Sequence, residues 1–176
     1  QAEISTIEVL LEAGQRLVTL HGPPGIGKTR LAIEIASRKE KDSAKPNRRW
    51  EGAFFVDLAE ARSVEGICYA AAQSLDETLL QGVTAAETVA EIGAYMEKRG
   101  RTLFVFDGFD VIFEHAPATI GEWMRSVPNA AFVIATPFMA AAQVVAGDCP
   151  PDSGSTMDTL LRDLDPVLPE GCAPVD

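Results

Sequence analysis

The residues best suited to chemistry form the run GPPGIGKT at positions 22–29. This run fits the pattern GxxxxGK[ST], in which glycines let the backbone curl around a phosphate chain with its N–H groups pointing inward. Lys28 can contact the β- and γ-phosphates of ATP, and the Thr29 hydroxyl can ligate Mg²⁺. The run therefore predicts a site for ATP or ADP with Mg²⁺. The residues expected to hold the nucleotide are Gly22, Gly25, Ile26, Gly27, Lys28, Thr29 and Arg30.

A second candidate group is the carboxylate of Asp107, which follows the apolar run LFVF. A strand that ends in an acid at this place delivers a carboxylate beside the Mg²⁺ of a phosphate loop. We assign Asp107 to the metal together with Thr29, and to catalysis together with Lys28. The next residue is Gly108, so Asp110 is the nearest acid that could orient a water molecule. The alternative for Asp110 is an ordinary acid at the start of a helix.

Other polar residues have simpler explanations. Asp57 follows the apolar run AFFV and is interpreted as a strand-end acid, with a carboxylate of the site as the alternative. His21 and His115 have no second His or Cys at metal-ligand spacing, so we expect them to satisfy local hydrogen bonds. The segment 39–49 is predicted to be a solvated surface loop, with partner binding as the alternative. Its basic residues are Lys39, Lys41, Lys45, Arg48 and Arg49.

Strand and helix signals alternate along the chain, and this alternation predicts the fold. Short aliphatic and aromatic runs predict strands at 16–20, 53–59, 102–106 and 131–135. Apolar spacing and capping residues predict helices near Ile4, over 29–38, after Ser63, after Thr84 and from Pro117. Near-continuous apolar strands separated by helices indicate an α/β fold, a three-layer P-loop NTPase with a mainly parallel sheet flanked by helices.

The composition bounds the class of protein. The chain has 176 residues, of which 47% are hydrophobic, and its 15 basic and 26 acidic residues give a net charge of −11. These values fit one compact domain and argue against direct contact with nucleic acid or an anionic membrane. The phosphate loop nevertheless lies within residues 1–50, where basic residues outnumber acidic ones.

The chain divides into two parts. Residues 1–147 are predicted to form the P-loop nucleotide-binding domain, and residues 148–176, rich in Pro, Gly, Asp and Ser, a polar tail or linker. The chain begins with Gln1 and carries no targeting signal, so we expect a domain cut from a longer protein. The uncharged stretch 126–147 is broken by Pro137 and is not expected to span a membrane. Three widely separated cysteines suit a reducing compartment, which favours the cytoplasm.

In order and spacing, four segments resemble the nucleotide-binding domain of bacterial STAND signalling ATPases. The segments are RLVTLHGPPGIGKTRLAIEIA, GAFFVDLAEARS, RTLFVFDGFDVIFEHA and NAAFVIATP. The resemblance implies a molecular switch that ADP holds inactive, and in which exchange for ATP permits oligomerisation. It also implies attached sensor or effector modules in a signalling or transcriptional regulator. For the sheet, it implies the additional-strand P-loop arrangement, with RTLFVFD beside RLVTL.

Two departures from that family bear on hydrolysis. The family usually carries an arginine near the end of the fourth strand that contacts the γ-phosphate, whereas this chain has Thr136, Pro137 and Phe138. Family members commonly show Asp-Asn or Asp-Asp where this chain has Asp107 and Gly108. We therefore expect a switch with slow, Mg²⁺-dependent ATP hydrolysis. The alternative is a non-hydrolysing or degenerate regulatory module, and a small-molecule kinase ranks below both.

Overall fold

The computed structural model describes residues 2–46, 48–109 and 112–136 of the chain. In this part, four strands form one parallel sheet in the order β1-β4-β3-β2. The strands are β1 (Leu17–His21), β2 (Gly52–Asp57), β3 (Thr102–Asp107) and β4 (Ala131–Thr136). The helices are α1 (Ala2–Glu12), α2 (Lys28–Ser43), α3 (Val64–Leu75), α4 (Ala85–Lys98) and α5 (Glu122–Ser126). Two short helical turns, Phe113–His115 and Pro117–Gly121, precede α5.

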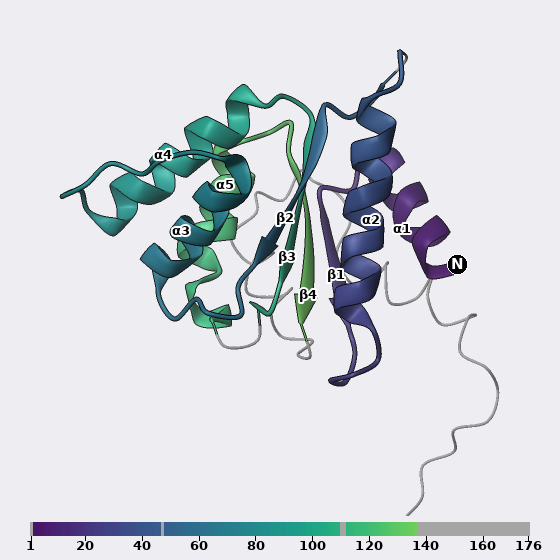
Figure 1. Cartoon of the computed structure of the whole chain (residues 1–176), viewed down its shortest axis with the longest axis horizontal. Helices are drawn as coiled ribbons and strands as arrows, with labels where there is room; N and C mark the ends of the chain where they lie inside the picture. Colours follow the sequence, from purple (N-terminus) through teal and green to yellow (C-terminus); the bar gives the residue numbers. More distant parts are fainter. Residues whose placement is uncertain (1, 47, 110–111, 137–176) are drawn as a thin grey trace, which may run out of the picture.

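Helices cover both faces of the sheet. Helices α1 and α2 pack on one face, and α3, α4 and α5 on the other, so the molecule has three layers (Figure 1). Each strand alternates its side chains between the two layers, as on β3, where Phe104 and Phe106 face α3 and α4 while Leu103 and Val105 face α2. The predicted three-layer α/β fold with a parallel sheet is confirmed.

The prediction of which strand lies beside β1 was wrong. The chain was predicted to place RTLFVFD beside RLVTL, but β4 lies between them and pairs with both β1 and β3. Burial explains the order, because all six residues of β4 and the first five of β3 are buried. Strands β1 and β2 are only partly buried and lie at the two ends of the described sheet. The most apolar strands therefore take the centre.

The segment predicted to be a loop after Arg38 is partly helical. Helix α2 continues to Ser43, and Lys39 is buried with 3% of its surface exposed. Its ammonium donates to the Glu12 carboxylate at 2.9 Å and lies over the Trp50 ring. Lys39 continues the apolar stripe of α2 and has a paired charge, which makes its burial tolerable.

Helices α3 and α4 begin where their capping residues predict. The Ser63 hydroxyl accepts from Gly66 N–H at the start of α3, and Thr84 with Glu87 forms a full capping box at the start of α4. Carboxylates at such positions also suit the positive end of the helix dipole. Both helices thereby start at defined points and cover the β2–β3 side of the sheet.

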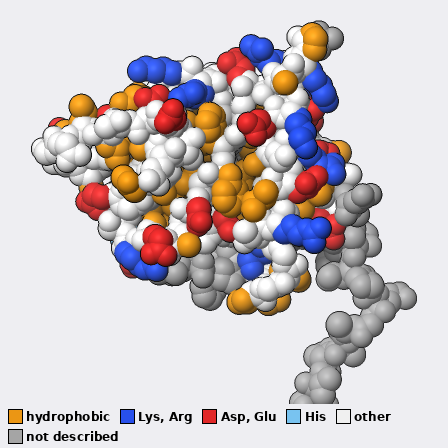
Figure 2. Space-filling model, in the orientation of Figure 1, with side chains coloured by type: hydrophobic (Ala, Val, Ile, Leu, Met, Phe, Trp, Pro, Cys, Tyr) orange, Lys and Arg blue, Asp and Glu red, His pale blue; other side chains and the backbone are white. Residues whose placement is uncertain are grey.

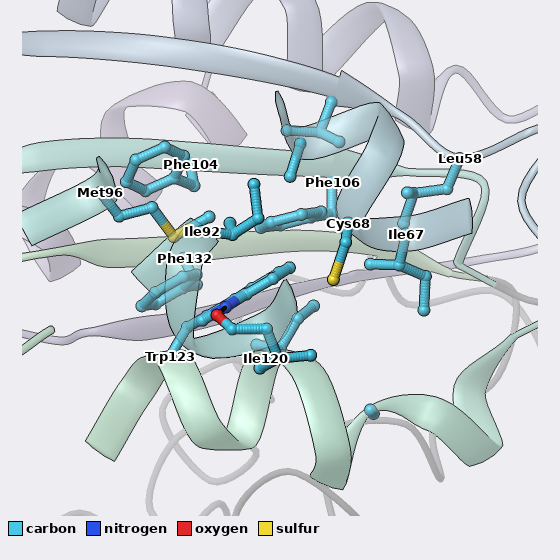
Figure 3. Close-up of a cluster of buried hydrophobic side chains, with 14 of the residues drawn as sticks. Leu58, Ile67, Cys68, Ile92, Met96, Phe104, Phe106, Ile120, Trp123 and Phe132 are labelled. Atoms are coloured by element: carbon cyan, nitrogen blue, oxygen red, sulfur yellow. Dashed lines mark hydrogen bonds between the residues drawn. The ribbon is translucent and has the colours of Figure 1, made fainter. Parts of the chain in front are cut away.

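An aromatic core holds the α3, α4 and α5 layer against the sheet (Figure 3). The ring of Phe104 stacks between those of Phe54 and Phe132, and Phe106 stacks on Trp123. The indole Nε1 of Trp123 donates to the carbonyl of Val89 at 2.8 Å, so the polar atom of this buried ring is satisfied. The core fixes α4 and α5 to the strands that end at the candidate site.

Several predictions made from the sequence lie outside the described residues. These are Asp110, Pro137, Phe138 and the boundary between residues 147 and 148. Among the helices that the structure describes, none combines the length and apolar character needed to cross a bilayer.

Candidate phosphate-binding site

The phosphate loop, residues 22–27, connects the end of β1 to the start of α2 and lies at the carboxyl edge of the sheet (Figure 1). Gly25 and Gly27 have φ values of 82° and 101°, in the left-handed region that other L residues rarely adopt. An added Cβ at either glycine would meet no atom within 4 Å, so the backbone conformation rather than space requires glycine there. The loop curls because of its glycines, as the motif predicts.

Helix α2 begins without a side-chain cap. Gly27 occupies the capping position, and no side-chain hydrogen bond is made there, in contrast to Ser63 at α3 and Thr84 at α4. The first backbone N–H groups of a helix have no partner within the helix, and they lie at the positive end of its dipole. The start of α2 therefore offers unpaired donors to an anion.

The ammonium group of Lys28 lies over the loop. Its Nζ donates to the carbonyl oxygens of Gly22 at 2.7 Å and Pro23 at 3.0 Å. These contacts hold a positive charge against the backbone of the loop. A phosphate bound to the loop would compete for that charge with two neutral carbonyl groups, and charge-assisted bonds are the stronger ones.

A surface pocket of about 510 Å³ adjoins the loop and the first two turns of α2. Its lining residues are Gly25, Gly27, Lys28, Thr29, Arg30, Ile33 and Glu34. Five of these were predicted from the motif. Of the other two predicted nucleotide-binding residues, Gly22 is buried at the start of the loop and Ile26 is 65% exposed, and neither lines this pocket.

The motif did not indicate Ile33 and Glu34, although helical geometry could have done so. These residues lie four positions after Thr29 and Arg30, so they share the same face of α2 one turn further on. Arg38 donates to Glu34 at 2.8 Å and lowers the pKa of this carboxyl, which is ionised at neutral pH. The far wall of the pocket therefore combines an exposed apolar side chain with a negative charge.

Asp107 ends β3 at the same edge of the sheet as the loop. Strand alternation places its side chain on the α2 face, as for Val105. One strand, β4, separates β3 from β1, which leads into the loop. The sheet thus brings a partly buried carboxylate to the edge and face that the phosphate loop occupies. Thr29, on the first turn of α2, is exposed there.

Asp57 is the register partner of Asp107 on β2, and alternation places it on the same face. Its Oδ1 accepts from Ala59 N–H at 2.9 Å, so this acid closes the turn after its strand. The contact agrees with the interpretation as a strand-end acid. The register nevertheless places two carboxylates side by side at this edge, which the sequence alone did not indicate.

Gly108 has a structural reason to be glycine. Its φ is 78°, and a Cβ there would lie 3.2 Å from the backbone N of Ala59. The backbone of the turn that follows β2 therefore approaches too closely for a larger residue to fit without movement. The close contact between the ends of β2 and β3 therefore disfavours an acid directly after Asp107.

The cysteine and the candidate metal-ligating side chains that were not assigned to the site show no reactive or metal-binding arrangement in the described part of the chain. Burial raises the pKa of the Cys68 thiol to about 12, so this cysteine stays protonated. In the described part of the chain, no three His, Cys, Asp or Glu side chains gather as a metal site. Magnesium in phosphate sites needs no such cage, because substrate phosphates and water supply most of its ligands.

Comparison with known proteins places the chain in a family. The model of the NACHT domain matches residues 16–164. An uncharacterized protein of Mycobacterium tuberculosis is 29% identical over 129 residues, which are 73% of this chain and 30% of that protein. A protein of the same species, provisionally named an HTH-type transcriptional regulator, is 32% identical over 119 residues, or 68% of this chain and 12% of that protein. The chain thus spans less than a third of either relative.

Solved structures support the fold. The Aeropyrum pernix ORC1 protein, solved in complex with DNA, superposes with a TM-score of 0.65 at 17% identity over 94% of this chain and 48% of its own. Cdc6p of Pyrobaculum aerophilum gives 0.59 at 19% identity over 84% and 42%. These likenesses are of fold alone, whereas the family match covers most of the sequence. The chain belongs to the NACHT domain family, a STAND-type group of P-loop NTPases.

Proposed function

We propose that this domain binds ATP or ADP with Mg²⁺ at the phosphate loop and acts as the nucleotide switch of a longer signalling protein. The observation that carries the proposal is the start of α2, where no described side chain caps the helix and Lys28 lies over the loop. This arrangement presents backbone donors and a positive charge to an anion. The NACHT family match and the adjoining pocket support the same reading.

Each predicted residue has a role in this proposal. Backbone N–H groups of the loop and of Arg30 hold the phosphates, and Lys28 contacts the β- and γ-phosphate oxygens. The Thr29 hydroxyl and the Asp107 carboxylate are the oxygen donors for Mg²⁺, a hard cation that prefers such ligands. When bound, Mg²⁺ neutralises charge on the phosphate oxygens.

Hydrolysis by this domain is proposed to be slow. Efficient phosphoryl transfer needs a group that orients the attacking water and positive charge on the transferring phosphoryl group. Gly108 supplies no carboxylate, and its backbone conformation disfavours one. An arginine that contacts the γ-phosphate contributes a factor of about 10³ to 10⁵ in related enzymes, and residue 138, where the family pattern has one, is Phe.

The second candidate is a regulatory module that binds nucleotide without hydrolysing it. The close approach of Gly108 to Ala59 favours this candidate, because it leaves Asp107 without an adjacent acid. Asp110 remains the proposed water-orienting residue if hydrolysis occurs. Phosphate release separates the two candidates.

The wider role is proposed from the relatives. The chain spans 12% of a relative named as a transcriptional regulator, so we propose that sensor or effector modules accompany this domain and that ATP permits oligomerisation. Residues 148–176 are proposed to be a linker to such a module. The acidic net charge supports a switch that does not itself contact nucleic acid, although the ORC1 neighbour was solved with DNA. The widely separated cysteines support a cytoplasmic location.

The experiment measures equilibrium binding of ATP, ADP and GTP with Mg²⁺, together with phosphate release. We expect the wild type to bind ATP and ADP, and Lys28→Ala to weaken binding at least about tenfold because a charge-assisted phosphate contact is lost. The matched control is Lys41→Ala, which removes an exposed lysine from the same helix away from the loop.

Each result has a defined meaning. Binding with measurable phosphate release supports the slow ATPase, and binding without release supports the non-hydrolysing module. An absence of nucleotide affinity in the wild type, or equal losses for Lys28→Ala and Lys41→Ala, would contradict the proposed site. Turnover that requires an added acceptor metabolite would instead indicate a kinase.

A further inference from the structure

A second groove lies on the opposite side of the sheet from the phosphate loop, between α3, α4 and the connection that joins them. It has a volume of about 530 Å³ and is called the α3–α4 groove below. The side chains that carry the argument are Glu65, Tyr69, Gln73, Glu77, Leu80 and Val83. The first three are spaced by four residues, so one face of α3 forms a wall.

Apolar side chains are exposed along this groove. Tyr69 is 60% exposed, Leu80 64% and Val83 38%, and they rank among the most exposed large hydrophobic residues in the described part of the chain. Figure 2 shows hydrophobic side chains at the surface over α3 and α4. Isolated exposed apolar residues need no explanation, but several beside one groove indicate a contact surface. Tyrosine in particular contributes strongly to binding where it becomes covered.

The segment 63–97, which contains the groove residues, carries only negative charges, and Arg62 and Lys98 flank it. Between Arg62 and Lys98 the chain has six acidic residues and no Lys, Arg or His. Hydrogen bonds to its own backbone N–H and to the Ser63 hydroxyl lower the pKa of Glu65, which is ionised at neutral pH. Arg99, outside this segment, pairs with Glu77 at 3.1 Å and neutralises part of the charge. The groove is thus apolar inside with a negative surround.

We propose that the α3–α4 groove docks a basic amphipathic helix of a partner protein. Apolar side chains of that helix cover Tyr69, Leu80 and Val83, and its lysines or arginines face Glu65 and Glu77, the two carboxylates that line the groove. The choice of occupant rests on charge complementarity, since an acidic partner, a nucleic acid or an anionic membrane would be repelled.

The proposed contact is independent of the nucleotide site. The groove belongs to the α3–α4 layer, while the phosphate loop leads into α2 in the other layer. Loss of nucleotide binding in Lys28→Ala therefore predicts no loss of helix docking, and substitutions in the groove predict no loss of nucleotide binding. The two proposals can fail separately.

The test uses a synthetic helical peptide of leucine and lysine, with leucines on one face, titrated into the whole chain. The wild type is expected to bind it in a saturable one-to-one complex that weakens as salt screens the charges. Leu80→Ser is expected to weaken binding about tenfold, because it removes an exposed apolar side chain that lines the groove. Val9→Ser on α1 is the matched control, since Val9 is 66% exposed and distant from the groove.

A second pair of variants tests the charge. Glu65→Lys is expected to weaken peptide binding more than Glu97→Lys, which makes the same change on α4 outside the groove. Equal effects within either pair, equal binding of a leucine and glutamate peptide, or no binding would overturn the proposal. Salt-sensitive self-association that Leu80→Ser abolishes would also overturn it, because the occupant would then be a second copy of this chain.

Discussion

Asp57 and Asp107 are identical side chains at one register position that differ in their hydrogen bonds. Both follow apolar strand residues and point to the α2 face. Asp57 uses Oδ1 to close its own turn through Ala59, whereas Asp107 has no such turn contact among the hydrogen bonds of the described residues. This difference supports the proposal that Asp107, rather than Asp57, is the carboxylate that binds Mg²⁺.

The comparison of Asp107→Asn with Asp57→Asn tests this assignment. Asp107→Asn is expected to lower nucleotide affinity about tenfold in the presence of Mg²⁺, because a neutral amide is a weaker ligand for a hard cation. The loss should vanish when Mg²⁺ is chelated. Asp57→Asn should keep the Mg²⁺-dependent affinity, since its amide oxygen can still accept from Ala59. Calorimetric titration of ADP measures both, and equal losses in the two variants would contradict the assignment.

Residue types also show what could be predicted from the sequence. The phosphate loop was recognisable because glycine at 25 and 27 is demanded by backbone conformation, which leaves a mark on the sequence. The pairing of Asp57 with Asp107 was not recognisable, because it depends on which strands are neighbours. Ile33 and Glu34 were missed because the motif ends at Thr29 while the pocket continues along α2.

At the scale of elements, a partly buried charge network joins the end of α2 to α1. Glu12 at the end of α1 accepts from Lys39 and from the Trp50 indole, both at 2.9 Å, and Arg49 lies 2.9 Å from its other oxygen. Such a network was not predictable from the basic composition of 39–49, which suggested solvent. The stripe of Ala32, Ile35, Ala36 and Lys39 on α2 was the available signal.

Glu12→Gln tests the network. Burial alone would raise the pKa of Glu12, but hydrogen bonds from Lys39 and Trp50 hold it below its ordinary value. The folded protein therefore binds fewer protons at Glu12 than the unfolded chain, and the stabilisation is lost as pH falls. The variant is expected to be about 2 kcal/mol less stable at pH 7, and the gap should narrow between about pH 5 and pH 3.

Urea unfolding of the wild type and Glu12→Gln at pH 7 and at about pH 3 measures the difference in stability between them. Arg38→Ala is a control, because its pair with Glu34 is an exposed ion pair of the same helix and is expected to contribute at most about 0.5 kcal/mol. A gap that stays constant with pH would show that the Glu12 charge does not stabilise the α1 and α2 contact.

Arg16 joins a second pair of elements. Its guanidinium donates to the carbonyl oxygens of Met124, Val127 and Ala130, which end α5 and lead into β4. Carbonyl groups at a helix end lack partners within the helix and attract positive charge. Arg16 therefore ties the start of β1 to the segment that positions the central strand β4.

Arg16→Ala is expected to lower the free energy of unfolding by about 2–3 kcal/mol, since several partly buried acceptors lose a charged donor. Arg16→Lys should recover part of this loss, because one ammonium cannot reach all three carbonyls in the fork geometry of arginine. Urea denaturation measures both variants. A loss below about 0.5 kcal/mol for Arg16→Ala would mean that the carbonyls are satisfied without it.

At the scale of the whole molecule, local patterns predicted the elements and the layers but not the strand order. Helix caps at Ser63 and Thr84 and apolar runs act over a few residues, so they are visible in the sequence. The order β1-β4-β3-β2 depends on long-range pairing. The complete burial of β4 is consistent with its central place, and the apolar run 131–135 was the available hint.

At the same scale, the proposed function predicts that bound nucleotide stabilises the folded chain against thermal unfolding. ADP with Mg²⁺ at about 100-fold above Kd is expected to raise Tm by about 5–10 °C, because binding to the folded state alone contributes about 2.7 kcal/mol. A thermal scan with and without ligand measures the shift, with Lys28→Ala as the control, which should show at most about half of it because a tenfold weaker Kd lowers the stabilisation to about 1.4 kcal/mol. An equal shift in both proteins would indicate binding away from the phosphate loop.

The most direct test of the central claim is an amide NMR titration of the labelled chain with ADP and Mg²⁺. We predict saturable shifts concentrated at the amides of residues 25–30, where the loop meets the uncapped start of α2. The same titration of Lys28→Ala should show them only at far higher ligand concentration. An absence of shifts in the wild type, or shifts concentrated in the α3–α4 groove instead, would contradict a nucleotide site at the phosphate loop.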